Sequence, residues 1–429
     1  MEYKEYELGE LIEYRNEKLL IENVSLENYI STENLLPNRS GKQNAEKLPN
    51  TKSVKRYYEN DILISNIRPY FKKIWQAEIP GGASNDVLIL NSCSNKITND
   101  YLYYYLSQDK FFDYMTQTAK GTKMPRGDKK AILDYEIKVP NIKHIQNYIV
   151  NLGKNIDKKI ETNKKIIANL EELSQTLFKR WFVDFEFPDE NGNPYKSSGG
   201  EMVDSELGEI PLNWKCSKIK DINVIISDHV ANGSFKSLKE NVQFTEDLND
   251  KYAVFARNVD LKKGDNRFEK YVTKSSYEFL RKSHLHGHEV IISNVGDVGS
   301  VYLSPILNRP MVLGNNQIFI NSDEKSLNYY FYLFFKSSIG KNLIDSITSG
   351  SVQMKFNKTD LRNSLIVFPC KNDMNNLITV IKKNIYSIEN KKSENMQLIQ
   401  LRDTLLPKLM SGEIEIPDDI EVNEDELSI

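Results

Sequence analysis

Basic and amide side chains on predicted turns are the residues of this sequence whose chemistry is most informative. Arginine makes bidentate hydrogen bonds with guanine and lysine attracts phosphate, so these residues are candidates for nucleic-acid contacts. The candidates in the first half of the chain are Arg39, Lys42, Arg56, Arg68, Lys72, Lys73, Lys123 and Arg126. The candidates in the second half are Lys236, Lys239, Arg257, Asn258, Arg267, Arg309, Lys355 and Lys358. One such residue is usually an ordinary surface charge, and the set is informative because it recurs in corresponding loops of two similar halves.

Alternating histidines in His284-Leu-His-Gly-His288 could share one face of a strand and bind a metal ion. An internal repeat aligns this stretch with Tyr57–Asp61, a predicted turn that contains no histidine, so a turn with incidental histidines is favoured. Asp184-Phe-Glu186 and Asp189 vaguely suggest the carboxylate cluster of a nuclease. Because no Glu-x-Lys element completes that cluster, a solvated acidic linker is favoured.

Sequence motifs of several common enzyme classes are absent. A methyltransferase would need a glycine-rich cofactor loop and an Asn/Asp-Pro-Pro-aromatic stretch, and neither occurs. The chain also lacks the GxxxxGK(S/T) phosphate loop and the GxSxG nucleophile elbow. Its three cysteines, Cys93, Cys216 and Cys370, are far apart, which disfavours a disulfide framework or a structural zinc site. We therefore expect no catalytic residue, no cofactor and no metal site.

Length and composition indicate a globular protein of several domains. The 429 residues suggest about two to four domains, and 39% of them are hydrophobic while 27% are charged. No apolar run approaches a membrane span and no secretory signal begins the chain, so a cytoplasmic location without membrane association is expected. The net charge is −3, but residues 183–211 and 413–429 contain eight acidic residues each. The remainder has 56 basic and 44 acidic residues, which is compatible with a polyanionic partner.

An internal duplication decides the predicted architecture. Asp61–Ile67 matches Glu289–Val295 at an offset of 228 residues, and Ser84–Leu90 matches Gly314–Ile320 at an offset of 230. Three further pairs keep the same order: Tyr101–Leu106 with Tyr329–Phe334, Gly121-Thr122 with Gly350-Ser351, and Val139-Pro140 with Phe368-Pro369. The chain is therefore predicted to contain two copies of one domain, each followed by one long helix.

Each copy is predicted to have α+β structure. Short β-branched runs bounded by turn residues predict strands at Ile62–Asn66, Val87–Leu90, Val290–Asn294 and Ile318–Ile320. Asn99 and Asp100 can cap a helix that starts near Tyr101. Its tyrosines could stack on bases, but their helical spacing favours a place in the core. Polar segments rich in glycine, proline, asparagine and lysine predict loops at Pro37–Pro49 and Gly121–Lys130.

Each copy ends in a long helical pattern with one apolar seam at steps of three and four residues. The predicted seams are Ile145, Ile149, Leu152, Ile156, Ile166, Leu170, Leu173 and Leu177, and Ile378, Ile381, Ile385, Ile388, Leu398, Leu401 and Leu405. Lys159 and Asn163 interrupt the first seam, and Lys392 and Asn395 interrupt the second at a comparable place. The pattern favours two helices packed on each other, and two separate amphipathic helices are the alternative.

Several motifs together resemble one protein family. The resembling stretches are Ile62–Lys73 with Gly82–Asp86, Leu177–Phe185 with Val203–Pro211, and Leu405–Ile414. In type and order they are similar to the DNA-specificity (S) subunit of type I restriction-modification enzymes, and the likeness covers essentially the whole chain.

The resemblance implies a non-catalytic subunit that binds double-stranded DNA. Each copy would be a target-recognition domain that reads one half of a bipartite site, and the helices would set the spacing between the halves. The helices would also dock two modification (methyltransferase) subunits, and restriction (translocase-nuclease) subunits would join that core. The implied fold class is α+β: two similar target-recognition domains separated by a pair of long antiparallel coiled-coil helices, with a pseudo-twofold internal repeat.

Composition shifts and the resemblance divide the chain into six segments. They are target-recognition domain 1 at 1–141, spacer helix 1 at 142–183, an acidic linker at 184–211, target-recognition domain 2 at 212–371, spacer helix 2 at 372–410 and an acidic tail at 411–429.

The second copy departs from the first, so single contacts cannot be transferred between them. Val295–Ser300 replaces Ile67–Lys72, and the region between Val230 and Tyr252 is longer than its counterpart. That insertion is either extra recognition structure or a surface loop. Two other functional classes stay open: a free-standing nuclease or fused methyltransferase, which would need a catalytic motif set, and a coiled-coil scaffold, which would not bind DNA at moderate salt.

Overall fold

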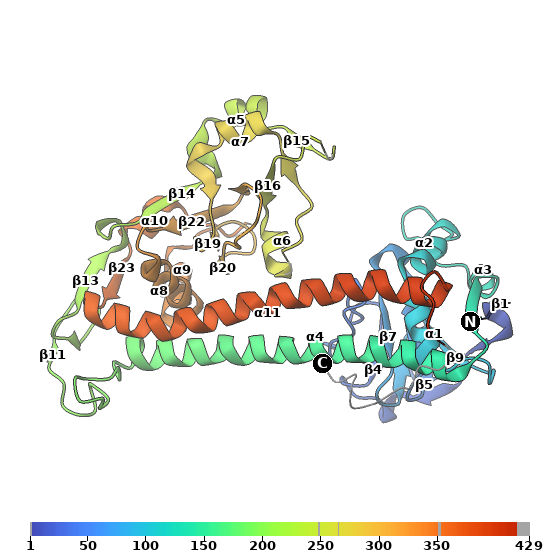
Figure 1. Cartoon of the computed structure of the whole chain (residues 1–429). Helices are drawn as coiled ribbons and strands as arrows, with labels where there is room; N and C mark the ends of the chain where they lie inside the picture. Colours follow the sequence, from blue (N-terminus) through green and yellow to red (C-terminus); the bar gives the residue numbers. More distant parts are fainter. Residues whose placement is uncertain (1, 248, 265, 351–352, 418–429) are drawn as a thin grey trace. The chain divides into compact units, whose positions relative to one another are not determined.

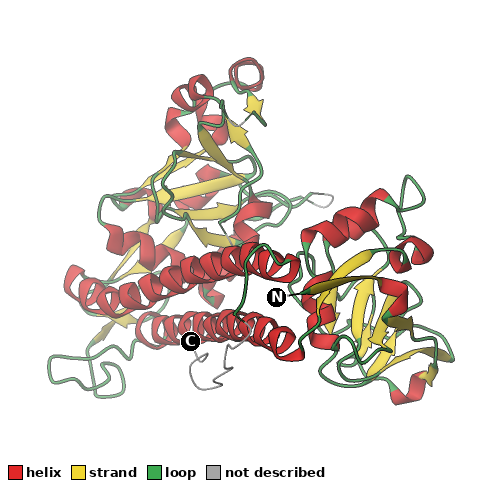
Figure 2. Ribbon diagram, turned by 45° about the vertical axis from the view of Figure 1, so that its right-hand side comes forward, coloured by secondary structure: helices red, strands yellow, loops and turns green. Residues whose placement is uncertain are grey.

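The chain forms two compact units, each of which combines a mixed α+β body with parts of two long helices (Figures 1 and 2). Unit 1 comprises Met1–Thr162 and Gln397–Ile429, and unit 2 comprises Asn163–Met396. The structure, a computed structural model, describes residues 2–247, 249–264, 266–350 and 353–417. Most of the predicted acidic tail, 418–429, lies outside the described residues. Within them, no helix is both long and apolar enough to cross a membrane.

Unit 1 contains two four-stranded sheets and a two-stranded ribbon, with strand orders β2-β9-β6-β7, β3-β5-β8-β4 and β1-β10. Its strands are β1 (Tyr3–Glu7), β2 (Ile12–Tyr14), β3 (Lys18–Leu20), β4 (Tyr29–Ile30), β5 (Ser53–Tyr57), β6 (Ile62–Ser65), β7 (Ile74–Gln76), β8 (Gly81–Ala83), β9 (Val87–Ser92) and β10 (Glu136–Pro140). Its shorter helices are α1 (Asn99–Leu106), α2 (Asp109–Gln117) and α3 (Lys129–Leu133), with single turns η1 (Leu8–Glu10), η2 (Ile21–Asn23) and η3 (Pro69–Phe71).

Unit 2 contains sheets of order β14-β22-β19-β20 and β15-β17-β16-β21-β18, and the pairs β13-β23 and β11-β12. Its strands are β11 (Met202–Val203), β12 (Ile210–Pro211), β13 (Lys215–Lys218), β14 (Ile225–Asp228), β15 (Phe244–Thr245), β16 (Ala253–Ala256), β17 (Tyr271–Val272), β18 (His284–Leu285), β19 (Val290–Ser293), β20 (Val301–Leu303), β21 (Met311–Leu313), β22 (Gln317–Asn321) and β23 (Leu365–Phe368). Its shorter helices are α5 (Phe235–Asn241), α6 (Asn258–Lys263), α7 (Lys274–Phe279), α8 (Lys325–Lys336), α9 (Ser338–Ile347) and α10 (Lys358–Asn363), with turns η4 (Lys179–Val183), η5 (Ile219–Asp221), η6 (His229–Asn232) and η7 (Arg281–Ser283).

The strand topology confirms the internal repeat and the α+β fold class. The order β2-β9-β6-β7 in unit 1 is reproduced as β14-β22-β19-β20 in unit 2, and β1-β10 as β13-β23. Ile62 opposes Leu90 in the first sheet, and Val290 opposes Ile320 at the same place in the second. In the other sheet, β8 runs parallel to β4 as β21 runs parallel to β16. The units differ at the edges of this sheet, where unit 1 adds β3 and unit 2 adds β17 and β15.

The predicted aromatic helices lie in the cores. Tyr101 and Tyr104 of α1 are buried, as are Tyr329 and Tyr330 of α8, so these rings fill the interior. The N-cap of α1 is Thr98, whose hydroxyl accepts a hydrogen bond from the Tyr101 amide. The cap prediction was therefore wrong, because Asn99 and Asp100 are the first two residues of the helix.

The two long helices, α4 (Lys143–Phe178) and α11 (Lys371–Ser411), pack on each other in antiparallel fashion within each unit (Figure 2). In unit 1, Arg402 contacts Asp157 at 2.6 Å. In unit 2, Asn395 contacts Asn163, and Asn384 donates to Ser174 at 3.2 Å. As the residue numbers on α4 rise, the residue numbers of their contact partners on α11 fall, so the two helices run antiparallel. This confirms the prediction that the two helices pack on each other.

The phase of the predicted seam is wrong in the second half of α4. Ile166 and Leu173 are 36% and 46% exposed, whereas Asn163 and Ser174 are buried. The contact face advances through Asn163 to Ser174 at steps of four and three, one residue away from the predicted apolar positions. Apolar spacing alone therefore selected the outer face of this helix segment. Leu401 of α11, another predicted seam residue, is likewise exposed.

The predicted acidic linker is packed onto unit 2. The ring of Phe187 stacks on Trp214 with centroids 5.1 Å apart and also stacks on Tyr195. Ile210, at the end of the segment, is buried in the same cluster. The carboxylate of Asp184 pairs with Lys179 at 2.7 Å, so it neutralises a neighbouring lysine.

The histidines of residues 284–288 point to different partners. His284 stacks on Tyr277 with centroids 3.8 Å apart, whereas His288 contacts Tyr329 and Glu389. His288 has a φ of 66°, as Asn60 has a φ of 67° at the equivalent turn before β6. This common left-handed position supports a turn at the end of the stretch, whereas His284 and Leu285 form β18. The described residues contain no group of three or more His, Cys, Asp or Glu arranged to hold a metal ion.

The buried amides of Asn163 and Asn395 generate a stability prediction. The Nδ2 of Asn163 donates to the Oδ1 of Asn395 at 2.9 Å. Asn163→Leu alone should reduce the free energy of unfolding by about 1–3 kcal/mol, because the partner amide stays buried without its hydrogen bond. Replacing both residues by leucine should raise stability by about 1 kcal/mol above the wild type. Thermal and urea unfolding of the two single variants and the double variant measure this, and additive losses would contradict it.

His229, which is buried, and His284, which is partly buried, generate a pH prediction for unit 2. Burial lowers the pKa of His284 and of His229, so folding favours their neutral forms. The unfolded state then binds more protons, and stability should fall as the pH drops below about 6.5. Thermal unfolding between pH 7.5 and 5.5 should show a smaller decrease in the double variant His229→Gln, His284→Gln than in the wild type. The exposed His286 supplies the control His286→Gln, which should keep the wild-type pH dependence.

Candidate nucleic-acid interface

Three loops of unit 1 meet where β6 ends, and backbone hydrogen bonds hold them together. The amide of Asn66 donates to the carbonyl of Asp86 at 2.8 Å, and the carbonyl of Asn66 accepts from Gly127 at 3.0 Å. The amide of Arg68 donates to the carbonyl of Pro125 at 2.8 Å. The segment after β6, the turn before β9 and the loop 120–127 therefore form one framework, which we call the recognition framework of unit 1.

Unit 2 repeats this arrangement with other side chains. The amide of Asn294 donates to Asn316 at 3.0 Å, and its carbonyl accepts from Phe356 at 3.1 Å. The amide of Gly296 donates to the carbonyl of Met354 at 3.4 Å. Because these bonds join backbone atoms, the framework persists although the residues that it presents have changed.

The recognition framework of unit 1 presents cations beside apolar side chains. Arg68, Lys123 and Arg126 are exposed on it, and Arg126 also pairs with Asp86 at 3.2 Å. Three large apolar residues are exposed on the same loops: Tyr70, Phe71 and Met124. Guanidinium and ammonium groups can neutralise phosphates, while aromatic side chains can contact bases.

Left-handed backbone geometry is concentrated beside this framework. Asn38, Arg39, Arg68 and Lys72 have φ values between 49° and 60°, which non-glycine residues rarely adopt. Two hydrogen bonds fix them: the amide of Asn38 donates to the carbonyl of Phe71, and that of Arg39 to Lys72. Backbone strain of this kind clusters at ligand-binding loops, and here it fixes how η3 displays its aromatic residues.

Several predicted contact residues of unit 1 have intramolecular partners in the structure. Arg39 donates to the carbonyl of Ser107 at 2.7 Å and to Asp403 at 3.1 Å, so it ties its loop to α11. Lys72 pairs with Asp109 at 2.7 Å, next to the same guanidinium. These cations hold the framework in place.

The remaining candidates of unit 1 are also engaged. Lys73 donates to the carbonyl of Thr32, and burial lowers the pKa of its ammonium group. Two cations lie over aromatic rings: Lys42 is 5.6 Å from the ring centroid of Trp75, and Arg56 is 4.6 Å from that of Tyr58. Lys42 also donates to the carbonyl of Glu27 at 2.6 Å.

Charge pairing dominates the corresponding region of unit 2. Arg257 donates to Asp260 at 2.7 Å and to Glu269 at 2.8 Å. Hydrogen bonds from Lys263 and then from Arg257 lower the pKa of Glu269 to about 2. Arg257 therefore clamps α6 to the segment that leads to β17.

The other candidates of unit 2 lie on separate loops. Asn258 contacts Asp297 at 3.3 Å, and Lys358 donates to Asp228 at 2.7 Å. Arg309 lies over the ring of Tyr271 at 5.2 Å. The candidates that are exposed are Lys236, Lys239, Arg267, Arg309 and Lys355. Of these five residues, only Lys355 lies on the framework, where its backbone forms isolated antiparallel β-bridges with Ser349 and Val295.

The two frameworks differ in the sign of the charges that they present as well as in residue type. Where unit 1 has Pro69, unit 2 has Asp297, which pairs with Lys262 at 3.1 Å. Hydrogen bonds, first from Lys262, lower the pKa of Asp297, so it is an anion at neutral pH. A carboxylate can accept a hydrogen bond from cytosine, whereas the exposed arginines of unit 1 suit guanine.

Sequence reasoning missed three exposed basic residues of unit 2 that lie next to α5: Lys274, Arg281 and Lys282. They belong to α7 and η7, which pack beside α5 and η6. The longer segment of the second copy could have indicated these residues. A segment that only one copy contains forms a surface that the other copy lacks, and the residues that pack beside it become part of that surface.

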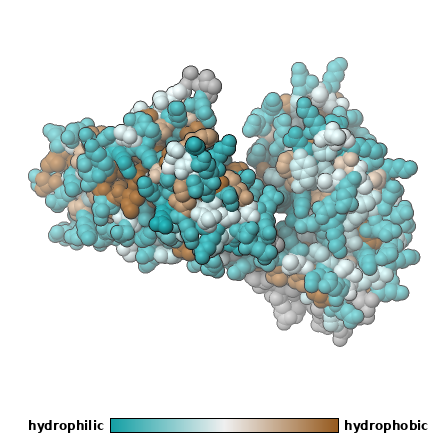
Figure 3. Space-filling view, turned by 90° about the horizontal axis from the view of Figure 1, so that it is seen from above, coloured by the Kyte–Doolittle hydropathy of each residue, from teal (hydrophilic) through white to brown (hydrophobic). Residues whose placement is uncertain are grey.

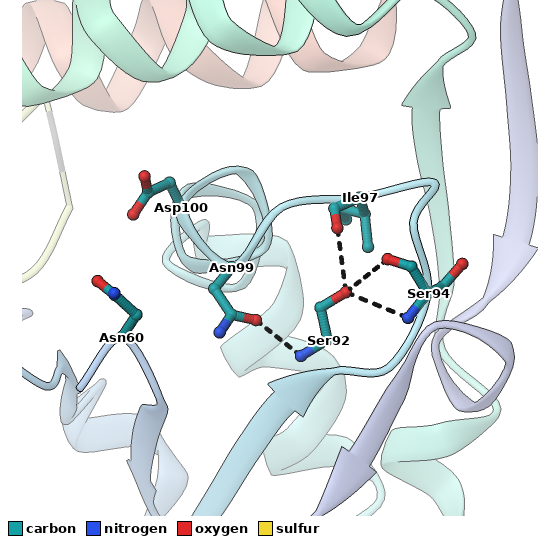
Figure 4. Close-up of a pocket in the computed structure, with 6 residues that line it drawn as sticks. All are labelled: Asn60, Ser92, Ser94, Ile97, Asn99 and Asp100. Atoms are coloured by element: carbon teal, nitrogen blue, oxygen red, sulfur yellow. Dashed lines mark hydrogen bonds between the residues drawn. The ribbon is translucent and has the colours of Figure 1, made fainter. Parts of the chain in front are cut away.

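A polar hollow of about 400 Å³ in unit 1 is lined by none of the predicted basic contact residues (Figure 4). It lies at the turn between β9 and α1, where the Ser92 amide donates to the Oδ1 of Asn99 at 2.7 Å. Its lining contains one carboxylate, Asp100, and no basic side chain. The hydrogen bond from Ser92 to Asn99 closes the turn. A lining with a carboxylate and without a cation is unsuited to a phosphate.

Comparisons with known proteins agree with this architecture. Residues 1–172 match the family described as type I restriction modification DNA specificity domain. The HindI specificity subunit of Haemophilus influenzae is 22% identical over 96% of this chain and 100% of that protein. The MjaIX specificity subunit of Methanocaldococcus jannaschii is 24% identical over 75% of this chain and 70% of that protein.

The fold has a counterpart among solved structures. The crystal structure of the type I restriction-modification S subunit from M. genitalium covers 97% of both chains with a TM-score of 0.50 and 14% sequence identity. The repeated strand topology and the paired long helices fit that similarity. Residues 1–172 thus match the family of type I restriction modification DNA specificity domains, and proteins named as specificity subunits of type I restriction enzymes are similar to this chain over 75–96% of its length.

Proposed function

We propose that this chain is the sequence-specific DNA-binding subunit of a type I restriction-modification complex, in which each half reads one part of a bipartite site. Residues 1–141 and 212–371 act as the two target-recognition domains. The observation that carries the proposal is the recognition framework, which recurs with the same backbone hydrogen bonds and exposes different side chains in each unit.

Unlike side chains on a common framework support unlike half-sites. Unit 1 presents Arg68, Tyr70 and Arg126, whereas unit 2 presents Asp297 and Lys355 at the corresponding loops. Base edges in the major groove differ in their donors and acceptors, so these two sets favour different bases. Phosphate contacts then supply most of the salt-sensitive affinity, and groove contacts supply the specificity.

The helix pair supports a spacer and a docking role. Its buried asparagine pair fixes the alignment of two antiparallel helices. Among the side chains that the structure describes on the helices in unit 2, the large apolar residues that are exposed include Ile166, Leu173, Val380 and Tyr386. Exposed apolar residues on a paired helix surface suit further helices, and we propose that two methyltransferase subunits dock on the pair. Restriction subunits complete the assembly, and the chain itself performs no catalysis.

Charge removal on the framework of unit 1 tests the proposal. The triple variant Arg68→Gln, Lys123→Gln, Arg126→Gln should bind a DNA duplex more weakly than the wild type. The slope of log affinity against log salt should become shallower by about 0.9 for each lost phosphate contact. Fluorescence anisotropy with the full-length chain at 50–300 mM salt measures both quantities.

The control removes three exposed charges elsewhere in unit 1, at Lys47, Lys52 and Lys143. If this control weakens binding as much as the framework variant does, the contacts are not localised. The same preparations, incubated with DNA and either Mg²⁺ or a methyl donor, should leave the DNA unmodified. Turnover there would favour the alternative, a free-standing nuclease or fused methyltransferase.

Shortening both helices tests the spacer role. Deleting one heptad from each, 156–162 and 396–402, removes facing segments that pair through Asp157 and Arg402. Seven residues span about 10 Å of helix, so the gap between half-sites should shorten by about three base pairs. Mapping methylated bases in cells that carry the variant complex reads the spacer directly, and an unchanged gap would eliminate the spacer role.

A further inference from the structure

We propose that α5 of unit 2 is a DNA wedge: Phe235 inserts between stacked base pairs of the half-site that unit 2 reads. The inference rests on the proposed function and deepens it, because it assigns a DNA-deforming role to a segment that unit 1 lacks. Fourteen residues, 15–28, separate β2 from β4 in unit 1, whereas 24 residues, 229–252, separate β14 from β16 in unit 2.

Phe235 is the large apolar residue with the greatest exposure among those described. Its exposed fraction is 84%, and that of Val230 on the adjoining turn η6 is 64%. Isolated surface apolar residues are common, but two this exposed on neighbouring elements form a projecting apolar tip. The surface in Figure 3 is mostly hydrophilic, with hydrophobic residues gathered in separate patches.

The tip is held rigidly, as an inserting side chain requires. Ser234 caps α5, and its Oγ accepts a hydrogen bond from the Ser237 amide at 3.2 Å. On the inner side Leu238 is buried in a cluster with Phe255 and Leu280. Burial of Leu238 therefore fixes the helix and leaves Phe235 in solvent at its first position.

The elements around the tip are basic. Figure 1 shows α5 and α7 side by side, and η6 packs on η7. The exposed basic residues of these elements are Lys236 and Lys239 on α5, Lys274 on α7, and Arg281 and Lys282 on η7. Against these five cations the same elements carry two acidic residues, Glu240 and Glu278. An apolar tip within a cationic rim fits a partner with an anionic exterior and an apolar interior, which describes duplex DNA.

The tip is continuous with the recognition framework of unit 2. Lys358, three residues after the framework residue Lys355, donates to the Oδ1 of Asp228 at 2.7 Å. The same carboxylate accepts the amide of Ala231 at 2.9 Å and so caps η6. A duplex seated on the loop at Lys355 would therefore meet the turn on which α5 packs.

Insertion of an apolar side chain partly unstacks one base step and bends the duplex. The probe is a 40-base-pair duplex that carries the bipartite site obtained from methylation mapping, with 2-aminopurine placed at successive positions of each half. Unstacking of the base raises its fluorescence. Wild-type protein should raise the signal at one step of one half-site, and Phe235→Ala should abolish it and weaken binding at least about fivefold.

Two variants control the experiment. Phe235→Trp keeps a ring that can insert and should retain both the affinity and the fluorescence signal. Ile306→Ala removes another exposed apolar side chain of unit 2, 61% exposed against 84% for Phe235, and should change neither quantity.

Each other outcome rejects the wedge. Wild-type affinity and an unchanged signal in Phe235→Ala would show that the ring does not enter DNA. Normal DNA binding by that variant, with loss of methyltransferase binding, would assign the tip to a protein partner. A wild-type protein that binds neither the mapped nor a random duplex would reject the proposed function itself, and the wedge with it.

Discussion

The hydrogen bond between Asn163 and Asn395 is the constraint on which the helix pairing depends. An amide buried in an apolar contact is costly unless it finds a partner, so alignments that separate these two residues are disfavoured. α4 follows β10 and α11 follows β23 with very short connections, so the alignment also decides which parts of each body face the helices. Each body also contacts α11 through a polar pair of its own: His288 with Glu389 in unit 2, and Arg39 with Asp403 in unit 1.

The two copies of the duplicated domain keep the same backbone hydrogen bonds in the recognition framework but present different side chains on it. The bonds around Asn66 and Asn294 join amides to carbonyls, so the framework tolerates Arg68 in one unit and Gly296 in the other. Divergence then falls on exposed residues, where it alters charge and shape at little cost in stability. The largest divergence is the α5 insertion of unit 2, which leaves the order β14-β22-β19-β20 intact.

Local pattern predicted local structure well. The strands at Ile62 and Val290, the duplication and the long helices all follow from apolar runs and turn residues. The phase of α4 could not be predicted, because the polar Asn163 and Ser174 face α11 while the apolar Ile166 does not. The partners of the candidate site residues could not be predicted for a related reason: Arg39 donates to Asp403, which lies 364 residues away, and no local pattern reveals such a pair.

Unit 1 is assembled from both ends of the described chain. Leu409 and Met410 of α11 and Ile416 beyond it are buried in one cluster with Tyr101 and residues near the N-terminus. A ribosome makes all of unit 2 before it makes these residues, so the first body must wait with part of its core uncovered until Ile416 has been made. A nascent chain stopped after unit 2 would hold one finished body and one open core, which chaperones and proteases recognise.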